Sequence, residues 1–152
     1  MSKIVQIPTS LIPLAELAIM AGRTPTKNEW KTWVLESQAI FRHEETIVIV
    51  PEGFMTDFAS IPFLFRWWQT GGTGPQRIAA YFHDYLYSEQ HKLSRKQSDQ
   101  IFRLVMKAAG NDKWRHAFRR WAMYLALRVG GFLAWRSNQK SLAEKGSGWR
   151  VL

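Results

Sequence analysis

His83 and Asp84 have the clearest capacity for chemistry, and they stand side by side in the run RIAAYFHDYLYSEQ. The run is otherwise mainly apolar and aromatic, which predicts a packed helix from about Gln76 to Glu89. An imidazole can act as a base near neutral pH, and a carboxylate is a ligand for hard cations. Because neighbouring residues on a helix point about 100° apart, the two side chains are suited to two adjacent tasks.

A second helix is predicted directly after the first, and it contains a further acid, Asp99. Ser94 and Gln97 form a capping-box pattern at its start, and the helix is expected to end at Gly110. If the two helices pair as an antiparallel hairpin, His83 and Asp99 are equally distant from the middle of the link. The spacing therefore predicts that these two residues lie at the same height.

Asp99 opposite His83 is a candidate catalytic pair. The carboxylate can accept the imidazole N–H, which fixes the tautomer and leaves the other ring nitrogen as a base. Two structural alternatives remain. His83 can be a hydrogen-bonded core histidine, and Asp99 can form a surface ion pair with Arg95 or Arg103, each four residues away on the same helix. Burial of Asp99 decides whether it forms such a surface ion pair.

Asp57, in the loop VPEGFMTDFASIP, is the candidate partner of Asp84. Two carboxylates together with loop carbonyls provide the hard oxygen ligands that calcium prefers. A carbonyl group polarised by such an ion can be attacked by a water molecule that His83 deprotonates. The alternative is that the Asp57 side chain simply caps a turn.

The elements that must position these residues are predicted to form one α+β domain over residues 1–152. The expected N-terminal extension covers 1–30 and contains a short helix at 12–21. A β-hairpin and the T-D loop are expected over 30–69, with strands at 30–41 and 46–50. Three helices are expected over 75–136, with the third starting near 112, and a loose tail over 137–152. The predicted architecture is an N-terminal hairpin packed on a three-helix C-terminal half.

The positive charge is concentrated toward the C-terminus. Residues 1–99 contain ten Lys or Arg and ten Asp or Glu, whereas residues 100–152 contain eleven and two, so the net charge of +9 lies in the second part. Arg115, Arg119 and Arg120 alternate with aromatic residues in KWRHAFRRW, which suits phospholipid headgroups or nucleic acid. No nucleic-acid motif accompanies them, so a phospholipid surface or another protein is favoured. An ordinary solvated helix face is the alternative.

Several classes of protein are disfavoured by composition. The chain contains no Cys, so disulfides and thiolate metal sites are excluded, and any metal must use oxygen or imidazole ligands. No run of apolar residues is long enough to predict a membrane span. The N-terminal stretch lacks the basic start of a signal peptide, so none is expected.

Three separated motifs resemble an uncharacterised family of small phage and bacterial proteins. They are VPEGFMTDFASIP, AAYFHDYLY and LSRKQSDQIFRLVMKAAG, and the resemblance covers roughly residues 30–130. It implies a phage or prophage origin, and with it a location in the host cytoplasm or in the phage virion. It implies no particular activity.

The His-Asp helix followed by a second helix with Asp99 is also similar to microbial phospholipases A2. That resemblance implies that His83 is the general base, Asp99 orients it, and Asp84 binds calcium together with Asp57 and the Phe58 carbonyl. By that resemblance Tyr87, Phe102 and Met106 would be supporting residues. Thr56 and Ser60 of the T-D loop are further candidate supporting residues. The chain departs from this family because it lacks the flanking cysteines and the usual Gly-rich calcium loop.

The leading functional hypothesis is a phospholipase A2-like, calcium-dependent hydrolase of acyl esters. The first alternative is a non-catalytic virion component, at the tail or baseplate, whose polar cluster is structural. The second is a basic protein that binds nucleic acid or a host factor. The third predicted helix is apolar on nearly all sides, which indicates burial against protein or another subunit.

Overall fold

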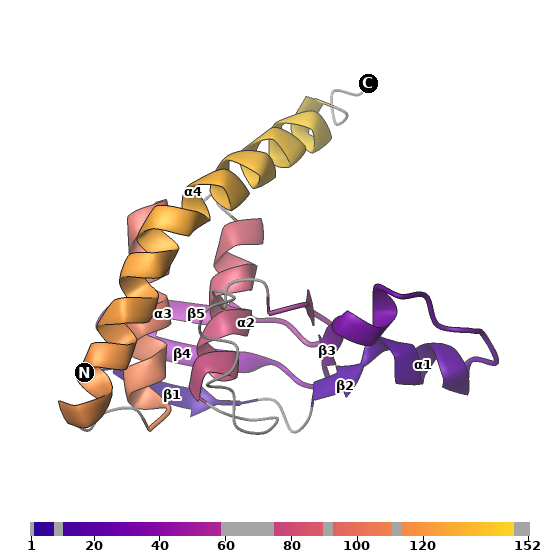
Figure 1. Cartoon of the computed structure of the whole chain (residues 1–152), viewed down its shortest axis with the longest axis horizontal. Helices are drawn as coiled ribbons and strands as arrows, with labels where there is room; N and C mark the ends of the chain where they lie inside the picture. The colour runs from indigo at the N-terminus through magenta and orange to yellow at the C-terminus, as the bar shows by residue number, and fades with distance from the viewer. Residues whose placement is uncertain (1, 8–10, 59–74, 90–92, 111–113, 148–152) are drawn as a thin grey trace.

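The computed structural model describes residues 2–7, 11–58, 75–89, 93–110 and 114–147, and for Ser2, Arg115 and 140–147 it describes the backbone alone. The fold is α+β, as predicted, with two small antiparallel sheets toward the N-terminus and long helices toward the C-terminus (Figure 1). The described strands are β1 (Ser2–Gln6), β2 (Leu11–Pro13), β3 (Trp33–Leu35), β4 (Ala39–His43), β5 (Thr46–Val50) and β6 (Met55–Thr56). The helices are α1 (Leu14–Met20), α2 (Pro75–Ser88), α3 (Arg95–Ala108) and α4 (Ala117–Ser147), with 3-10 turns at Glu29–Lys31 and Trp114–His116.

The predicted hairpin is formed by β4 and β5, with His43 opposite Thr46. Its alternation is that of a strand pair with one buried face, because Phe41, Val48 and Val50 are buried while Arg42 is exposed. β1 pairs antiparallel with the other edge of β4 and completes the first sheet, in the order β1-β4-β5.

The second sheet, in the order β2-β3-β6, differs from the prediction. Residues 30–41 were expected to form one strand, but they are divided between a 3-10 turn, β3 in this sheet and β4 in the other. The short helix predicted at 12–21 is present as α1, preceded directly by β2, and β1 and β2 were not predicted at all. Each pairs with a strand at least twenty residues away, which local sequence does not reveal.

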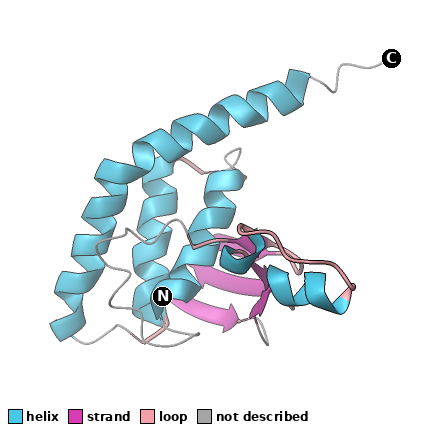
Figure 2. Cartoon of the chain, turned by 45° about the vertical axis from the view of Figure 1, so that its right-hand side comes forward, coloured by secondary structure: helices cyan, strands magenta, loops and turns pink. Residues whose placement is uncertain are grey.

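Helices α2 and α3 are close to their predicted bounds and pack on the first sheet (Figure 2). The Ser94 hydroxyl accepts from the Gln97 backbone N–H, and the Gln97 side chain accepts from the Ser94 backbone N–H. The predicted capping box is therefore confirmed. Phe82 from α2 and Phe41 from β4 meet edge to face in the core between helices and sheet, with ring centroids 6.0 Å apart.

Helix α4 is longer than predicted. It was expected to continue at most toward Trp135, and 137–152 was expected to be a loose tail, but residues 137–147 are helical. The segment SNQKSLAEKGS has no proline and includes several strong helix formers, which explains the extension. In Figures 1 and 2 the later part of α4 projects away from the other helices.

Gly131 lets α4 approach α2 closely, because a Cβ atom at this position would lie 2.5 Å from the Tyr87 hydroxyl oxygen. At the preceding residue, Gly130, a Cβ atom would meet no atom within 4 Å. The two neighbouring glycines therefore differ in function. Gly131 permits the close contact with Tyr87, whereas Gly130 makes no such contact and lowers the helix propensity of α4.

We expect opposite results from the same substitution at these two glycines. Gly131→Ala should lower the free energy of unfolding by about 1–3 kcal/mol, because Tyr87 must move. Gly130→Ala should raise it by up to about 1 kcal/mol, because Ala is the better helix former. Urea unfolding of both variants tests this. Equal changes in unfolding free energy in the two variants would contradict the close approach of Gly131 to Tyr87.

Candidate functional site

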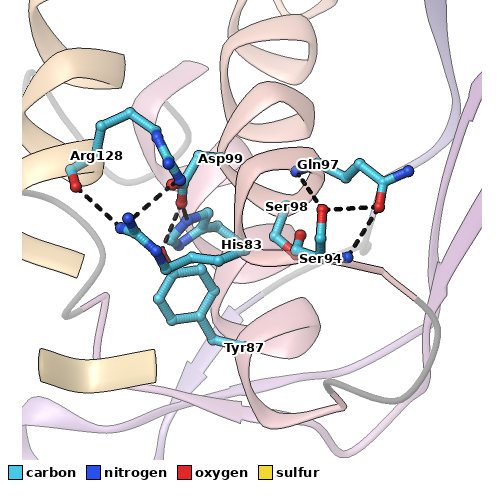
Figure 3. A network of polar contacts seen from close by, with 8 residues as sticks. His83, Tyr87, Ser94, Gln97, Ser98, Asp99 and Arg128 are labelled. Carbon is cyan, nitrogen blue, oxygen red and sulfur yellow. Dashed lines mark hydrogen bonds and ion pairs between the residues drawn. The ribbon is translucent and has the colours of Figure 1, made fainter. Parts of the chain in front are cut away.

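His83 and Asp99 face each other in the interior, as their spacing predicted. His83 Nε2 lies 2.8 Å from Asp99 Oδ1, and the two residues are 1% and 0% exposed (Figure 3). Asp99 also has Arg95 Nη1 at 3.8 Å, but its burial rules out an ordinary surface ion pair. His83 is thus a hydrogen-bonded buried histidine, which is compatible with the structural alternative and with the catalytic one.

Asp99 is the centre of a wider network. Tyr87 on α2 donates its hydroxyl hydrogen to Asp99 Oδ1 at 2.6 Å. Arg128 on α4 donates from Nη1 to Asp99 Oδ2 at 2.9 Å. The His83 and Tyr87 rings lie beside each other with centroids 4.1 Å apart. Three helices therefore converge on a single buried carboxylate.

The electrostatics of this network define the protonation of its members. Burial alone would raise the pKa of Asp99, but hydrogen bonds from His83, Tyr87 and Arg128 outweigh burial and hold that pKa below its ordinary value. Burial and the hydrogen bond to Asp99 raise the pKa of Tyr87, which stays protonated. Because an ionised Asp99 can only accept, the hydrogen between it and His83 is on Nε2. In the neutral ring the lone pair is then on Nδ1.

The lowered pKa of Asp99 predicts a loss of stability in acid. Its folded-state pKa lies below the unfolded value of about 3.9, so the ionised carboxylate stabilises the fold above that pH and ceases to do so as pH falls through the folded-state pKa. The difference in unfolding free energy between wild type and Asp99→Asn should be constant near neutral pH and should shrink in acid. Urea unfolding at a series of pH values measures it. A difference in unfolding free energy that does not change with pH would contradict the lowered pKa of Asp99.

Asp84 is held by the loop that precedes α2. Thr56 donates its hydroxyl hydrogen to Asp84 Oδ2 at 2.5 Å, and the Thr56 hydroxyl oxygen accepts from the Phe58 backbone N–H at 3.1 Å. Phe58 has a left-handed backbone with φ of 55°, an unusual conformation for a non-glycine residue. The loop that contains Asp57 is thereby attached to α2 at Asp84.

A pocket of about 540 Å³ lies between α2, the loop that precedes it and α4. His83 and Asp84 on α2 and Thr56 and Asp57 from the loop lie in its wall. The wall contributed by α4 consists largely of small residues. They are Ala126, Gly130, Gly131 and Ala134. The predicted base and both predicted metal-binding carboxylates therefore border one cavity.

The fit of a calcium ion can be judged from the donors at this pocket. Asp57, Asp84 and the Thr56 hydroxyl are hard oxygen donors, the chemical type that calcium prefers. Within the described ranges, no group of three or more His, Asp or Glu side chains is arranged to hold a metal ion. The two carboxylates fit a calcium site in chemical type, whereas the Thr56 hydroxyl is already bonded to Asp84 and to the Phe58 backbone N–H.

Several predicted residues are not assembled at this pocket. Ser60 lies outside the described residues, as does the side chain of Arg115. Arg119 and Arg120 are half-buried near the start of α4 and do not line the pocket. Among the helices of the described chain none is long and apolar enough to cross a membrane.

Arg128 and Asn138 were missed by the sequence analysis. The Asn138 side-chain amide donates to the Tyr87 backbone carbonyl at 3.2 Å and thus ties α4 to the end of α2. Arg128 had a usable signal, because it is the single charge in the apolar run WAMYLALRVGGFLAW. A lone charge on a buried face requires a partner, and here the partner is Asp99.

The fold and the site define an α+β protein with a buried His-Asp pair beside a pocket. Residues 33–127, more than half of the chain, match the family described as proteins of unknown function, DUF1353. The chain belongs to this family, which agrees with the predicted membership of an uncharacterised family. No curated protein and no solved structure matches the chain. The matched range includes His83, Asp84 and Asp99 and ends one residue before Arg128.

Proposed function

We propose that the pocket is the active site of a hydrolase that cleaves acyl esters of phospholipids. The observation that supports this most directly is the buried contact of 2.8 Å between His83 Nε2 and Asp99 Oδ1 in the wall of a 540 Å³ pocket. An oriented imidazole next to a cavity is the arrangement required of a general base.

In the proposed reaction His83 removes a proton from a water molecule through Nδ1 as the water oxygen attacks the ester carbonyl carbon. The bond from that carbon to the alcohol oxygen then breaks, and His83 returns the proton to the departing alkoxide. Asp99 stabilises the protonated ring through Nε2 and keeps it in one orientation. Tyr87 supports Asp99 by its own hydrogen bond to the same oxygen.

We propose that Asp84 and Asp57 bind a calcium ion, together with the Phe58 carbonyl. When bound, the ion supplies positive charge that polarises the ester carbonyl. The bond from Thr56 orients Asp84, because it occupies Oδ2 of that carboxylate. Millimolar calcium should raise the melting temperature of the wild type, and Asp84→Asn should abolish this rise. Asp84→Asn with the same rise as wild type would exclude this site.

A phospholipid surface is the proposed location of the substrate, and the start of α4 is the proposed contact. Trp114, Phe118 and Trp121 are 87%, 75% and 49% exposed. Arg119 and Arg120 lie among them. Exposed aromatic side chains interleaved with arginine are typical of helices that lie at an anionic lipid surface.

Phospholipid vesicles test both the proposed hydrolysis and the proposed lipid contact at the start of α4. The protein should release fatty acid from anionic phosphatidylglycerol vesicles and should bind them more tightly than phosphatidylcholine vesicles. Arg119→Gln should weaken binding by about 1 kcal/mol. Arg42→Gln, which removes an exposed charge from β4, is the matched control and should bind as wild type. Absence of fatty acid release with calcium present would refute the hydrolase.

A second candidate is a non-catalytic component of a phage particle. It is favoured by the exposed apolar side chains along α4, which include Leu125, Val129 and Leu133 at 56%, 83% and 75% exposure. Large exposed apolar patches commonly mark contacts between proteins. In that case the chain should occur in purified particles at a fixed copy number, and His83→Gln should leave infectivity unchanged.

A further inference from the structure

We propose that Arg128 is a positioning residue. It fixes the orientation of the Asp99 carboxylate, which in turn fixes the orientation of the His83 ring. This inference rests on the proposed hydrolase function for its consequence in turnover. Its structural part, the orientation of the His83 ring, can be tested independently. Arg128 is on α4, whereas the two residues that it would align are on α3 and α2.

The two oxygen atoms of Asp99 have different partners. Oδ1 accepts from His83 at 2.8 Å and from Tyr87 at 2.6 Å, both on α2. Oδ2 accepts from Arg128 at 2.9 Å (Figure 3). A carboxylate held at both oxygens cannot rotate about its Cβ–Cγ bond without breaking one set of contacts. Arg128 therefore constrains the oxygen to which the imidazole is bonded.

Arg128 is itself fixed in place. Arg95 on α3 donates from Nη1 to the Arg128 backbone carbonyl at 3.0 Å, and its guanidinium lies 5.9 Å from the centre of the Phe132 ring. The close approach of Gly131 to Tyr87 fixes the same turn of α4 against α2. The Arg128 backbone is thus anchored on both neighbouring helices.

Charge alone does not account for the arrangement. Arg95 Nη1 is already 3.8 Å from Asp99 Oδ2, so a second cation faces this carboxylate in addition to Arg128. Asp84 on α2 and Asp57 in the loop are the acidic groups at the pocket. What Arg128 adds over Arg95 is a hydrogen bond at 2.9 Å, donated by a rigid planar guanidinium, whereas a lysine presents a compact ammonium group on a flexible chain.

The test compares Arg128→Ala and Arg128→Lys with the wild type. Arg136→Ala is the matched control, because it removes an exposed arginine two turns farther along α4. Nitrogen-15 NMR of the His83 ring reports the tautomer and whether the ring occupies one state. Hydrolysis of phosphatidylglycerol vesicles reports kcat and KM separately.

We expect one Nε2-protonated state of His83 in the wild type and in Arg136→Ala, and a mixture of ring states in both Arg128 variants. The kcat of Arg128→Ala should fall by about a hundredfold with little change in KM, since small displacements of a catalytic group have effects of this size. Arg128→Lys keeps the positive charge, but its kcat should still be well below that of the wild type. It also provides a folded variant if Arg128→Ala does not fold.

Unchanged His83 nitrogen signals in a folded Arg128 variant would overturn the inference, whatever the activity. Full activity of Arg128→Lys with a single ring state would also overturn it, because charge would then suffice. If the signals change as expected but the wild type releases no fatty acid from vesicles with calcium present, the positioning of the ring is supported and the proposed hydrolase fails. The two proposals therefore fail separately.

Discussion

His83→Gln is expected to reduce the hydrolysis of phospholipid vesicles by about 10²–10⁴-fold, the usual contribution of a general base. Glutamine can keep a hydrogen bond to Asp99 through its amide, but it cannot take up a proton from water. The loss should therefore appear in kcat. Initial rates of fatty acid release, measured at saturating vesicle concentration, are the direct readout.

His43→Gln is the control for this substitution. His43 is at the end of β4, its side chain is 31% exposed, and it does not line the pocket of His83. The rate of this variant should equal that of the wild type. Circular dichroism and thermal unfolding establish that His83→Gln remains folded. A folded His83→Gln protein with at least a tenth of wild-type activity would refute the role of His83.

Asp99→Ala is expected to destabilise the fold by about 3–5 kcal/mol, the cost typical of removing one partner from a buried charged network. The substitution leaves Arg128, Tyr87 and His83 without the oxygen atoms that they contact. Because these three groups are on α2 and α4, the loss should weaken the packing of both helices on α3. The effect on stability does not depend on the proposed enzymatic activity.

Urea unfolding at neutral pH measures this loss, with Glu52→Ala as the control. Glu52 is an exposed carboxylate in the turn after β5, and its removal should change the unfolding free energy by no more than about 0.5 kcal/mol. A loss of less than about 1 kcal/mol in Asp99→Ala would mean that the network contributes little, contrary to the structure.

Local sequence signals predicted the elements that bear the site. The capping residues Ser94 and Gln97 placed the start of α3, and the apolar pattern before Glu89 placed α2. With both helices in register, equal spacing from the link was sufficient to predict that His83 and Asp99 face each other. These inferences succeeded because each depends on residues that are near one another in the chain.

The features that were missed depend on residues far apart in the chain. The pairing of β1 with β4 joins residues about forty positions apart, and the contact of Arg128 with Asp99 joins residues 29 positions apart. No local period encodes such pairs, because they depend on how whole elements pack. The apolar pattern of α4 predicted burial, but Leu125, Val129 and Leu133 are exposed in this chain. The residue of α4 that meets Asp99 became evident only from the packed helices.

The attachment of α4 has a mechanical consequence. The inner side of this helix holds Arg128 against Asp99 and Gly131 against Tyr87, while Trp121 and Leu125 remain exposed on its outer side. A force that lifted the helix from its neighbours would break the Arg128 bond and widen the cavity in a single movement. The position of α4 is therefore coupled directly to the position of the Asp99 carboxylate.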